Sequence, residues 1–168
     1  MSFSKVYHGS PEKRILSIPS RHKRTRKING KQQIIFDQES FHASSEYWIA
    51  LAYTYTPTYF EFEGKQIYYN VEIDLYKNRK EVIIHGINSL EESLNALYGR
   101  GGYISSFLEN DFFHTQGLGR LECITNTKLR AKKIVRIIDP VQKMRSLNIT
   151  FQFLDLSDDR NAHRRNFK

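Results

Sequence analysis

The pattern of apolar and polar positions predicts a chain with more strand than helix. Short alternating or β-branched runs favour strands at residues 4–8, 32–37 and 81–86. In the last third, the segments GYISSF, RLECIT, KKIVRII and NITFQFLD have the same character. Two alternating stretches flank Glu63-Gly64, which predicts a hairpin between roughly Tyr59 and Leu75.

Helical spacing occurs in two segments, and a third segment begins like a helical turn. Ser44 or Ser45 can cap a helix that ends by Pro57, since apolar residues recur there at i, i+3, i+4 and i+7 (Trp48, Leu51, Ala52 and Tyr55). Ser89 with Glu92 forms a capping box for a helix ending at Gly99. Asp139-Pro140 begins the short turn. The pattern predicts an α+β fold.

Length and composition favour a single domain over residues 1–156, followed by a basic, mobile tail at 157–168. The single cysteine, Cys123, excludes an internal disulfide and favours a reducing, cytoplasmic location. No apolar run approaches the ~18 residues that span a membrane, and the first residues lack the features of a signal peptide. We therefore expect no membrane partner.

Positive charge is concentrated in a few segments of a chain whose formal net charge is +8. Residues 21–31 hold six Lys or Arg, and further clusters occur at 128–136 and 160–168. We expect the first cluster to lie in a polar loop that runs to about Lys31. Such charge favours a polyanionic partner, either RNA or DNA or a phosphorylated cofactor, although a solvated loop, strand face and tail would give the same composition.

Several classes of site are disfavoured by their missing motifs. The six histidines and the cysteine show no paired metal-ligand spacing, so no metal is expected. A nucleophile elbow is absent, as are a GxxxxGK[ST] loop and a GxGxxG turn, which disfavours serine hydrolases and the common nucleotide-binding folds.

The segment VYHGSP, from Val6 to Pro11, raises a sharper question. Read alone, His8 and Gly9 could be a tight turn after an edge strand, or an imidazole beside a backbone that a ligand can approach closely. The sequence VYHGSPEKRILSI resembles the first strand and loop of the poly-ADP-ribose-polymerase-like branch of the ADP-ribosyltransferase fold, in which a strand ends in His-Gly-Ser or His-Gly-Thr.

Two later blocks extend this resemblance in the family's order. The segment IIFDQESFHASSEYWIALAYTYTP is similar to the second block, with Phe36 at a strand end and Tyr53 late in a helix. The segment GRLECITNTKLRAKKIVRI resembles the third block, with Glu122 at the start of a late strand. The resemblance implies a split β-sheet core with a few short helices, and a His-Tyr-Glu site formed by His8, Tyr53 and Glu122.

The resemblance also implies roles in binding NAD. His8 would bind a ribose hydroxyl, the Gly9 backbone would hold the nicotinamide amide, and Ser10 would hold the adenosine ribose. The pyrophosphate would need a cation from the basic cluster, Arg24 or Arg26.

An aromatic ring would stack on the nicotinamide, and here Tyr53 or Phe36 is available, with Tyr47 as a second choice. Helical geometry directs Tyr53 away from the Trp48 stripe, but it could instead be partly buried packing.

Glu122 would stabilise the positive charge that develops on the ribose and could help to deprotonate the acceptor. Strand alternation places Leu121 and Cys123 on the face opposite Glu122, so the carboxylate could also simply face solvent.

The resemblance implies an NAD-dependent mono-ADP-ribosyltransferase of the toxin type, which would have an antitoxin protein as partner. Its acceptor would be a nucleic acid or a protein. The position two residues before Glu122 is Arg120, so the sequence lacks the QxE or ExE pattern linked to arginine modification. Two alternatives remain open: an NAD-dependent RNA 2′-phosphotransferase on the same fold, and a non-catalytic nucleic-acid-binding module.

Overall fold

The computed structural model describes residues 4–77 and 79–158. It confirms an α+β fold in which, among these residues, three α-helices accompany mostly antiparallel sheets. Most of the expected tail, from residue 159 onward, lies outside the described residues. No helix in the described part of the chain is long and apolar enough to cross a membrane.

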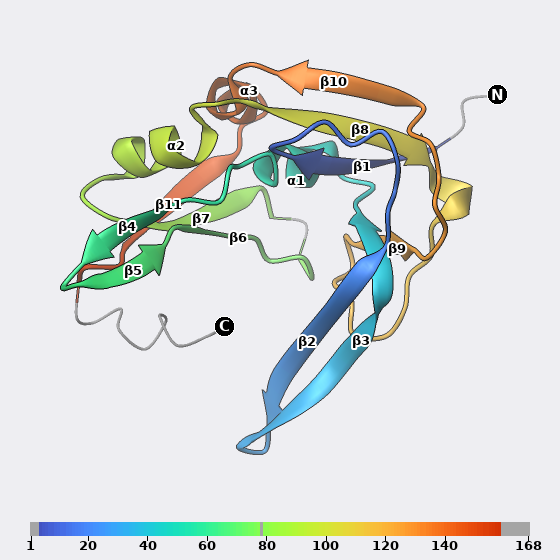
Figure 1. Ribbon diagram of the computed structural model, residues 1–168, viewed down its shortest axis with the longest axis horizontal. Helices are drawn as coiled ribbons and strands as arrows, with labels where there is room; N and C mark the ends of the chain where they lie inside the picture. The colour runs from blue at the N-terminus through green and yellow to red at the C-terminus, as the bar shows by residue number, and fades with distance from the viewer. Residues whose placement is uncertain (1–3, 78, 159–168) are drawn as a thin grey trace.

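Two separate three-stranded sheets form the body of the molecule (Figure 1). In the first, β8 (Gly102–Leu108) pairs antiparallel with β1 (Lys5–Ser10) and β10 (Lys133–Ile137). In the second, β7 (Glu81–Gly86) pairs antiparallel with β6 (Asn70–Glu72) and parallel with β11 (Thr150–Asp155). These strands agree with the expected apolar runs.

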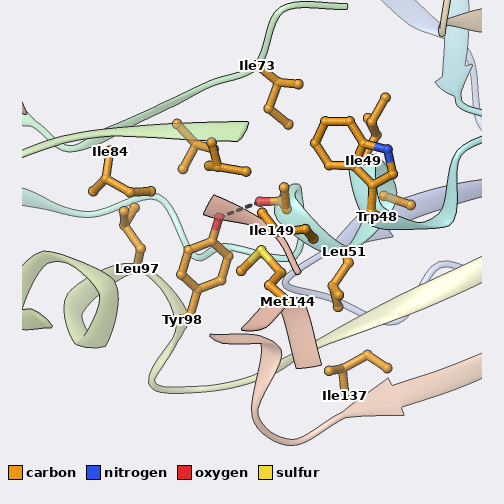
Figure 2. Close-up of a cluster of buried hydrophobic side chains, with 14 of the residues drawn as sticks. Trp48, Ile49, Leu51, Ile73, Ile84, Leu97, Tyr98, Ile137, Met144 and Ile149 are labelled. Carbon is orange, nitrogen blue, oxygen red and sulfur yellow. Dashed lines mark hydrogen bonds between the residues drawn. The ribbon is translucent and has the colours of Figure 1, made fainter. Parts of the chain in front are cut away.

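Helix α1 (Tyr47–Ala52) connects the cores of the two sheets, because its apolar residues are buried on every side. They share one hydrophobic cluster with residues of β7, β8, β10, α2 (Leu90–Tyr98) and α3 (Pro140–Ser146). Figure 2 shows this cluster, in which the Tyr98 hydroxyl donates a 2.6 Å hydrogen bond to the Ala52 carbonyl.

The local capping predictions for the second and third helices are confirmed. The Ser89 hydroxyl accepts a hydrogen bond from the Glu92 N–H at the start of α2, and Asp139 accepts one from the Gln142 N–H at the start of α3. For α1 the prediction of a serine cap is wrong. The N-cap is Glu46, because Ser44 is bonded to β1 and its hydroxyl donates to the Leu121 carbonyl.

The prediction of a polar loop up to Lys31 is also wrong. Residues Ser20–Ile28 form β2, which pairs with the 13-residue strand β3 (Lys31–Ala43) in a hairpin that projects from the body (Figure 1). The turn is Asn29-Gly30, and both residues have positive φ, as a two-residue hairpin turn requires. Strand β3 therefore continues past Phe36, where its end was expected, and its last residues pair with β9 (Cys123–Thr125).

The expected hairpin around Glu63-Gly64 is confirmed, but it ends at Tyr68 and not near Leu75, because Asn70–Glu72 pairs with β7 instead. Strands β4 (Tyr59–Phe62) and β5 (Lys65–Tyr68) form a two-stranded sheet of their own beside the body. The 3-10 turn η1 (Glu109–Asp111) follows β8 and leads toward the segment that carries Glu122.

Candidate functional site

A cavity of about 330 Å³ lies where β1, the end of β3, the end of α1 and the start of β9 meet. Its wall includes His8, Gly9, Arg24, Tyr53 and Glu122, five of the residues singled out from the sequence. The volume is at the lower end of the range for small-molecule sites, about 300–1,000 Å³. The cavity suits a small ligand or one end of a larger one.

Close contacts between β1 and the chain around α1 bring these segments together. Tyr7 and Ser44 exchange two backbone hydrogen bonds of 2.7 and 2.9 Å, which join β1 to the end of β3. Two residues after Tyr7 on β1, Gly9 packs against α1 so closely that a Cβ atom would lie 1.6 Å from the Ala50 carbonyl oxygen. The glycine is therefore required by packing, and it fixes His8 beside the cavity.

The Gly9 backbone is directed at the cavity by strand geometry. Residues two apart in a strand point their N–H and C=O groups to the same edge. Tyr7 uses this edge to bond Ser44 in an isolated antiparallel bridge, so the corresponding groups of Gly9 face the space that opens where β3 diverges from β1. Outside the strand ladders, no hydrogen bond from Gly9 occurs among the described residues. Such a donor and acceptor pair can hold a carboxamide.

His8 is held in one tautomer by its neighbours. Its Nδ1 lies 2.8 Å from the His42 carbonyl oxygen, which can only accept, so Nδ1 carries a proton. Burial lowers the pKa of His8 to about 4, more than the bond to His42 raises it. At neutral pH the ring is therefore uncharged, and its Nε2 is an acceptor suited to a hydroxyl group of a ligand.

Glu122 is a buried carboxylate with only 6% of its surface exposed, so the solvent-facing interpretation is wrong. The Arg24 guanidinium binds it with two bonds, Nη1 to Oε2 at 2.7 Å and Nη2 to Oε1 at 2.5 Å. His42 Nδ1 donates a third bond to Oε1 at 2.7 Å, and the Gly119 N–H lies 3.4 Å from Oε2. These donors account for why a charge can be buried here.

The charge state of Glu122 follows from these contacts. Burial alone would raise its pKa, but the hydrogen bonds from His42 and Arg24 and their positive charge lower it to about 2. The carboxylate is thus fully ionised at neutral pH. A group with so low a pKa is a weak base, so the geometry favours charge stabilisation over the proton abstraction that we also considered for Glu122.

Tyrosines form the apolar part of the cavity wall. Tyr53 follows the last residue of α1, lines the cavity and packs against the hydrophobic cluster, so it is partly buried packing as well as part of the cavity wall. Tyr55 and Tyr7 also line the wall, while Tyr47 packs edge-on against Tyr7, with ring centroids 5.4 Å apart. Burial raises the pKa of Tyr53 to about 12, so its ring is neutral and can stack on a heterocycle.

Two predicted residues lie away from the cavity wall. Phe36 is 5% exposed and packs against Leu118 and Ile124, because β3 continues beyond it. The Ser10 hydroxyl accepts a hydrogen bond from the Glu12 N–H in the turn that follows β1. Arg24 reaches the site but binds Glu122 instead of standing free for a phosphate.

Two further residues of the cavity wall, His42 and His22, were not predicted from the sequence. Their rings lie 4.3 Å apart, and His42 joins Ser40 to Glu122 through its two ring nitrogens, Nε2 to the hydroxyl at 2.9 Å. Alternation along β3 could have indicated that Ser40 and His42 share a face.

The Ser40–His42–Glu122 chain has the connectivity of a Ser-His-acid triad. Its serine is 0% exposed and is absent from the cavity wall, so a substrate cannot reach the hydroxyl. The arrangement therefore positions Glu122 and does not supply a nucleophile. In the described ranges, no group of three or more His, Cys, Asp or Glu side chains is placed to hold a metal ion.

Comparisons with known proteins leave the geometry as the basis for interpretation. No protein-family model matches the chain, and neither the curated proteins nor the solved structures searched include a match.

Proposed function

We propose that this cavity binds the nicotinamide and adjoining ribose of NAD, and that the protein is a mono-ADP-ribosyltransferase. The observation that carries the proposal is the convergence of His8, Gly9, Tyr53 and an ionised, buried Glu122 on one cavity. These are the residues to which the resemblance gave the NAD-binding and catalytic roles. Two three-stranded sheets with short helices also agree with its split-sheet core.

Each group has a chemically suitable partner in the substrate. The Gly9 N–H and C=O fit a carboxamide, the free Nε2 of His8 accepts a hydrogen bond from a ribose hydroxyl, and the neutral Tyr53 ring can stack on the pyridinium. The cationic nicotinamide ring and the developing ribose cation are both favoured near the anionic Glu122.

The reaction breaks the bond between ribose C1′ and the nicotinamide nitrogen. The bonding electrons leave with nicotinamide, which becomes neutral, and C1′ acquires oxocarbenium character, as in glycoside cleavage. An oxygen or nitrogen of the acceptor then forms a bond to C1′ and releases its proton to water. Glu122 stabilises the cation between these two steps, while Gly9 and His8 hold the substrate in place.

Arg24 can exchange its partner when NAD binds. In the free protein its guanidinium occupies both oxygens of Glu122 and offsets the negative charge. The diphosphate of NAD is a competing partner for the guanidinium fork. Transfer of Arg24 from Glu122 to the diphosphate would free the carboxylate when substrate binds, and it would reconcile the observed ion pair with the pyrophosphate role expected of Arg24.

The test is an acceptor screen with NAD labelled in its adenylate phosphate. Wild-type protein incubated with total RNA, DNA or protein should label one fraction, and Glu122→Gln should reduce labelling by about 10²–10³-fold. Glu39→Gln is the matched control, because Glu39 is an exposed carboxylate on β3 outside the cavity wall. Absence of label in every fraction, or equal labelling by Glu122→Gln, would overturn the proposal.

A further inference from the structure

The β2–β3 hairpin projects from the body (Figure 1). It begins at the edge of the cavity, and its two faces differ in charge. Side chains alternate along a strand, so His22, Arg24 and Arg26 share one face of β2. The first two line the cavity, which identifies this side as the cavity face. Arg26 is the next side chain outward on it.

The register shows which β3 residues belong to the cavity face, because directly opposed residues of an antiparallel pair share a face. Gln38 opposes His22, Phe36 opposes Arg24, and Gln33 opposes Arg26. A bulge between Arg24 and Thr25 leaves Ile35 as the extra residue of β3.

Lys31 opposes Ile28 at the hairpin tip, so it is on the cavity face as well. The cavity face therefore carries Arg24, Arg26 and Lys31 and no acidic residue. Both acidic residues of the hairpin are on the opposite face, where Glu39 opposes Arg21 and Asp37 opposes Lys23. Arg21 also donates a 2.7 Å hydrogen bond to Asp37.

The two outer cations of the cavity face are available to a partner, whereas Arg24 is bound to Glu122. Arg26 and Lys31 are exposed, and neither forms an ion pair within the described chain. At about 3.3 Å per residue they lie roughly 7 and 13 Å beyond Arg24 along the hairpin. They form a row of positive charge that leads away from the cavity.

An exposed aromatic residue adjoins the cavity. Tyr76 directly follows Leu75, which lines the cavity together with Arg24, and 54% of the surface of Tyr76 is exposed. Positive charge along a backbone track together with an exposed aromatic is the arrangement that binds single strands, because unpaired bases stack on the ring while phosphates contact the cations.

We infer that the cavity face of the β2–β3 hairpin binds single-stranded RNA and delivers it to the cavity as the acceptor. RNA is favoured because its loops and ends present unstacked bases to aromatic and arginine side chains, whereas bases in a duplex are inaccessible to a cavity. The amide of Gln33, which opposes Arg26, adds a polar group to the cavity face. The role of this RNA as the acceptor rests on the proposed function. The binding of RNA to the hairpin does not depend on it.

The test measures binding without NAD, so that it is independent of catalysis. Fluorescence anisotropy of a labelled, unstructured 12-nucleotide RNA is followed against salt concentration for the wild type and two double variants. Arg26→Ala/Lys31→Ala removes two charges from the cavity face, and Lys23→Ala/Lys27→Ala removes two from the opposite face. All four residues are exposed, so melting temperatures should change little.

We expect the cavity-face variant to weaken binding by about tenfold or more and to reduce the salt slope by about 1.4, since each phosphate contact contributes about 0.7 for a single strand. The opposite-face variant should bind within about twofold of wild type. Equal weakening by both variants, tighter binding of the matching single-stranded DNA or duplex RNA, or no binding at 50 mM salt would overturn the inference.

Nicotinamide release from NAD by the wild type, measured beside its RNA binding, separates this inference from the proposed function. RNA binding that depends on the cavity face, with no NAD cleavage, would refute only the transferase. NAD cleavage without RNA binding would refute only the docking surface.

Discussion

The burial of His8 predicts a loss of stability between pH 7 and pH 5. Its pKa is lowered from 6.5 to about 4 in the folded protein, so the unfolded chain binds the proton more readily over this range. The contribution of the neutral His8 to the free energy of unfolding is complete above pH 6.5 and is lost as the pH falls toward 4. With about 1.4 kcal/mol per pKa unit, the complete loss is about 3 kcal/mol, of which about 2 kcal/mol is lost by pH 5.

Urea unfolding followed by tryptophan fluorescence measures this loss. Trp48 is the one tryptophan of the chain and is 3% exposed, so its emission reports unfolding of the core. His8→Asn should flatten the stability curve between pH 7 and pH 5, because an amide keeps a donor for the His42 carbonyl but does not titrate. His114 is an exposed histidine, and His114→Asn should leave the wild-type slope intact. Burial of His22 lowers its pKa too and leaves a small residual slope.

A wild-type stability that stays constant from pH 7 to pH 5 would refute the reasoning. So would a His8→Asn variant that keeps the full wild-type slope, since the titrating group would then lie elsewhere.

Three further results are expected. Glu122→Gln should flatten the stability curve between pH 4.5 and 2, because a carboxyl pKa held near 2 contributes stability above pH 4.5 that is lost on acidification; an unchanged curve would contradict the ion pair. Gly9→Ala should lower stability by about 3 kcal/mol or more in thermal unfolding, since its Cβ would overlap the Ala50 carbonyl, and a near-neutral effect would show that β1 and α1 do not touch there. Tyr53→Ala should weaken NAD binding, measured by calorimetry, about tenfold or more, whereas Tyr53→Phe should retain it. Equal loss of affinity in both variants would show that the hydroxyl, and not the ring, contributes to binding.

Elements with local signals could be predicted from the sequence. The capping box at Ser89 and the turn at Glu63-Gly64 each specify a boundary within a few residues, and both are confirmed. Strand β2 was missed because both faces of the outer hairpin are exposed, so its sequence has no apolar alternation. The turn pair Asn29-Gly30 was the available signal for this hairpin.

The candidate site was predicted in part. His8, Gly9, Tyr53 and Glu122 converge, as the ordered motifs suggested, whereas Phe36 does not. The Arg24–Glu122 ion pair joins residues 98 positions apart, and no local pattern encodes such a contact. It depends on β3 pairing with both β2 and β9 in one sheet, which brings Arg24 to the residue before β9 and which only the tertiary structure shows.

The most direct measurement is nicotinamide release from NAD by the purified protein, followed by chromatography. The account predicts that wild type and Glu39→Gln release nicotinamide at the same rate in the presence of single-stranded RNA, and that Glu122→Gln is slower by about 10²–10³-fold. No release by the wild type, or equal release by Glu122→Gln, would contradict it.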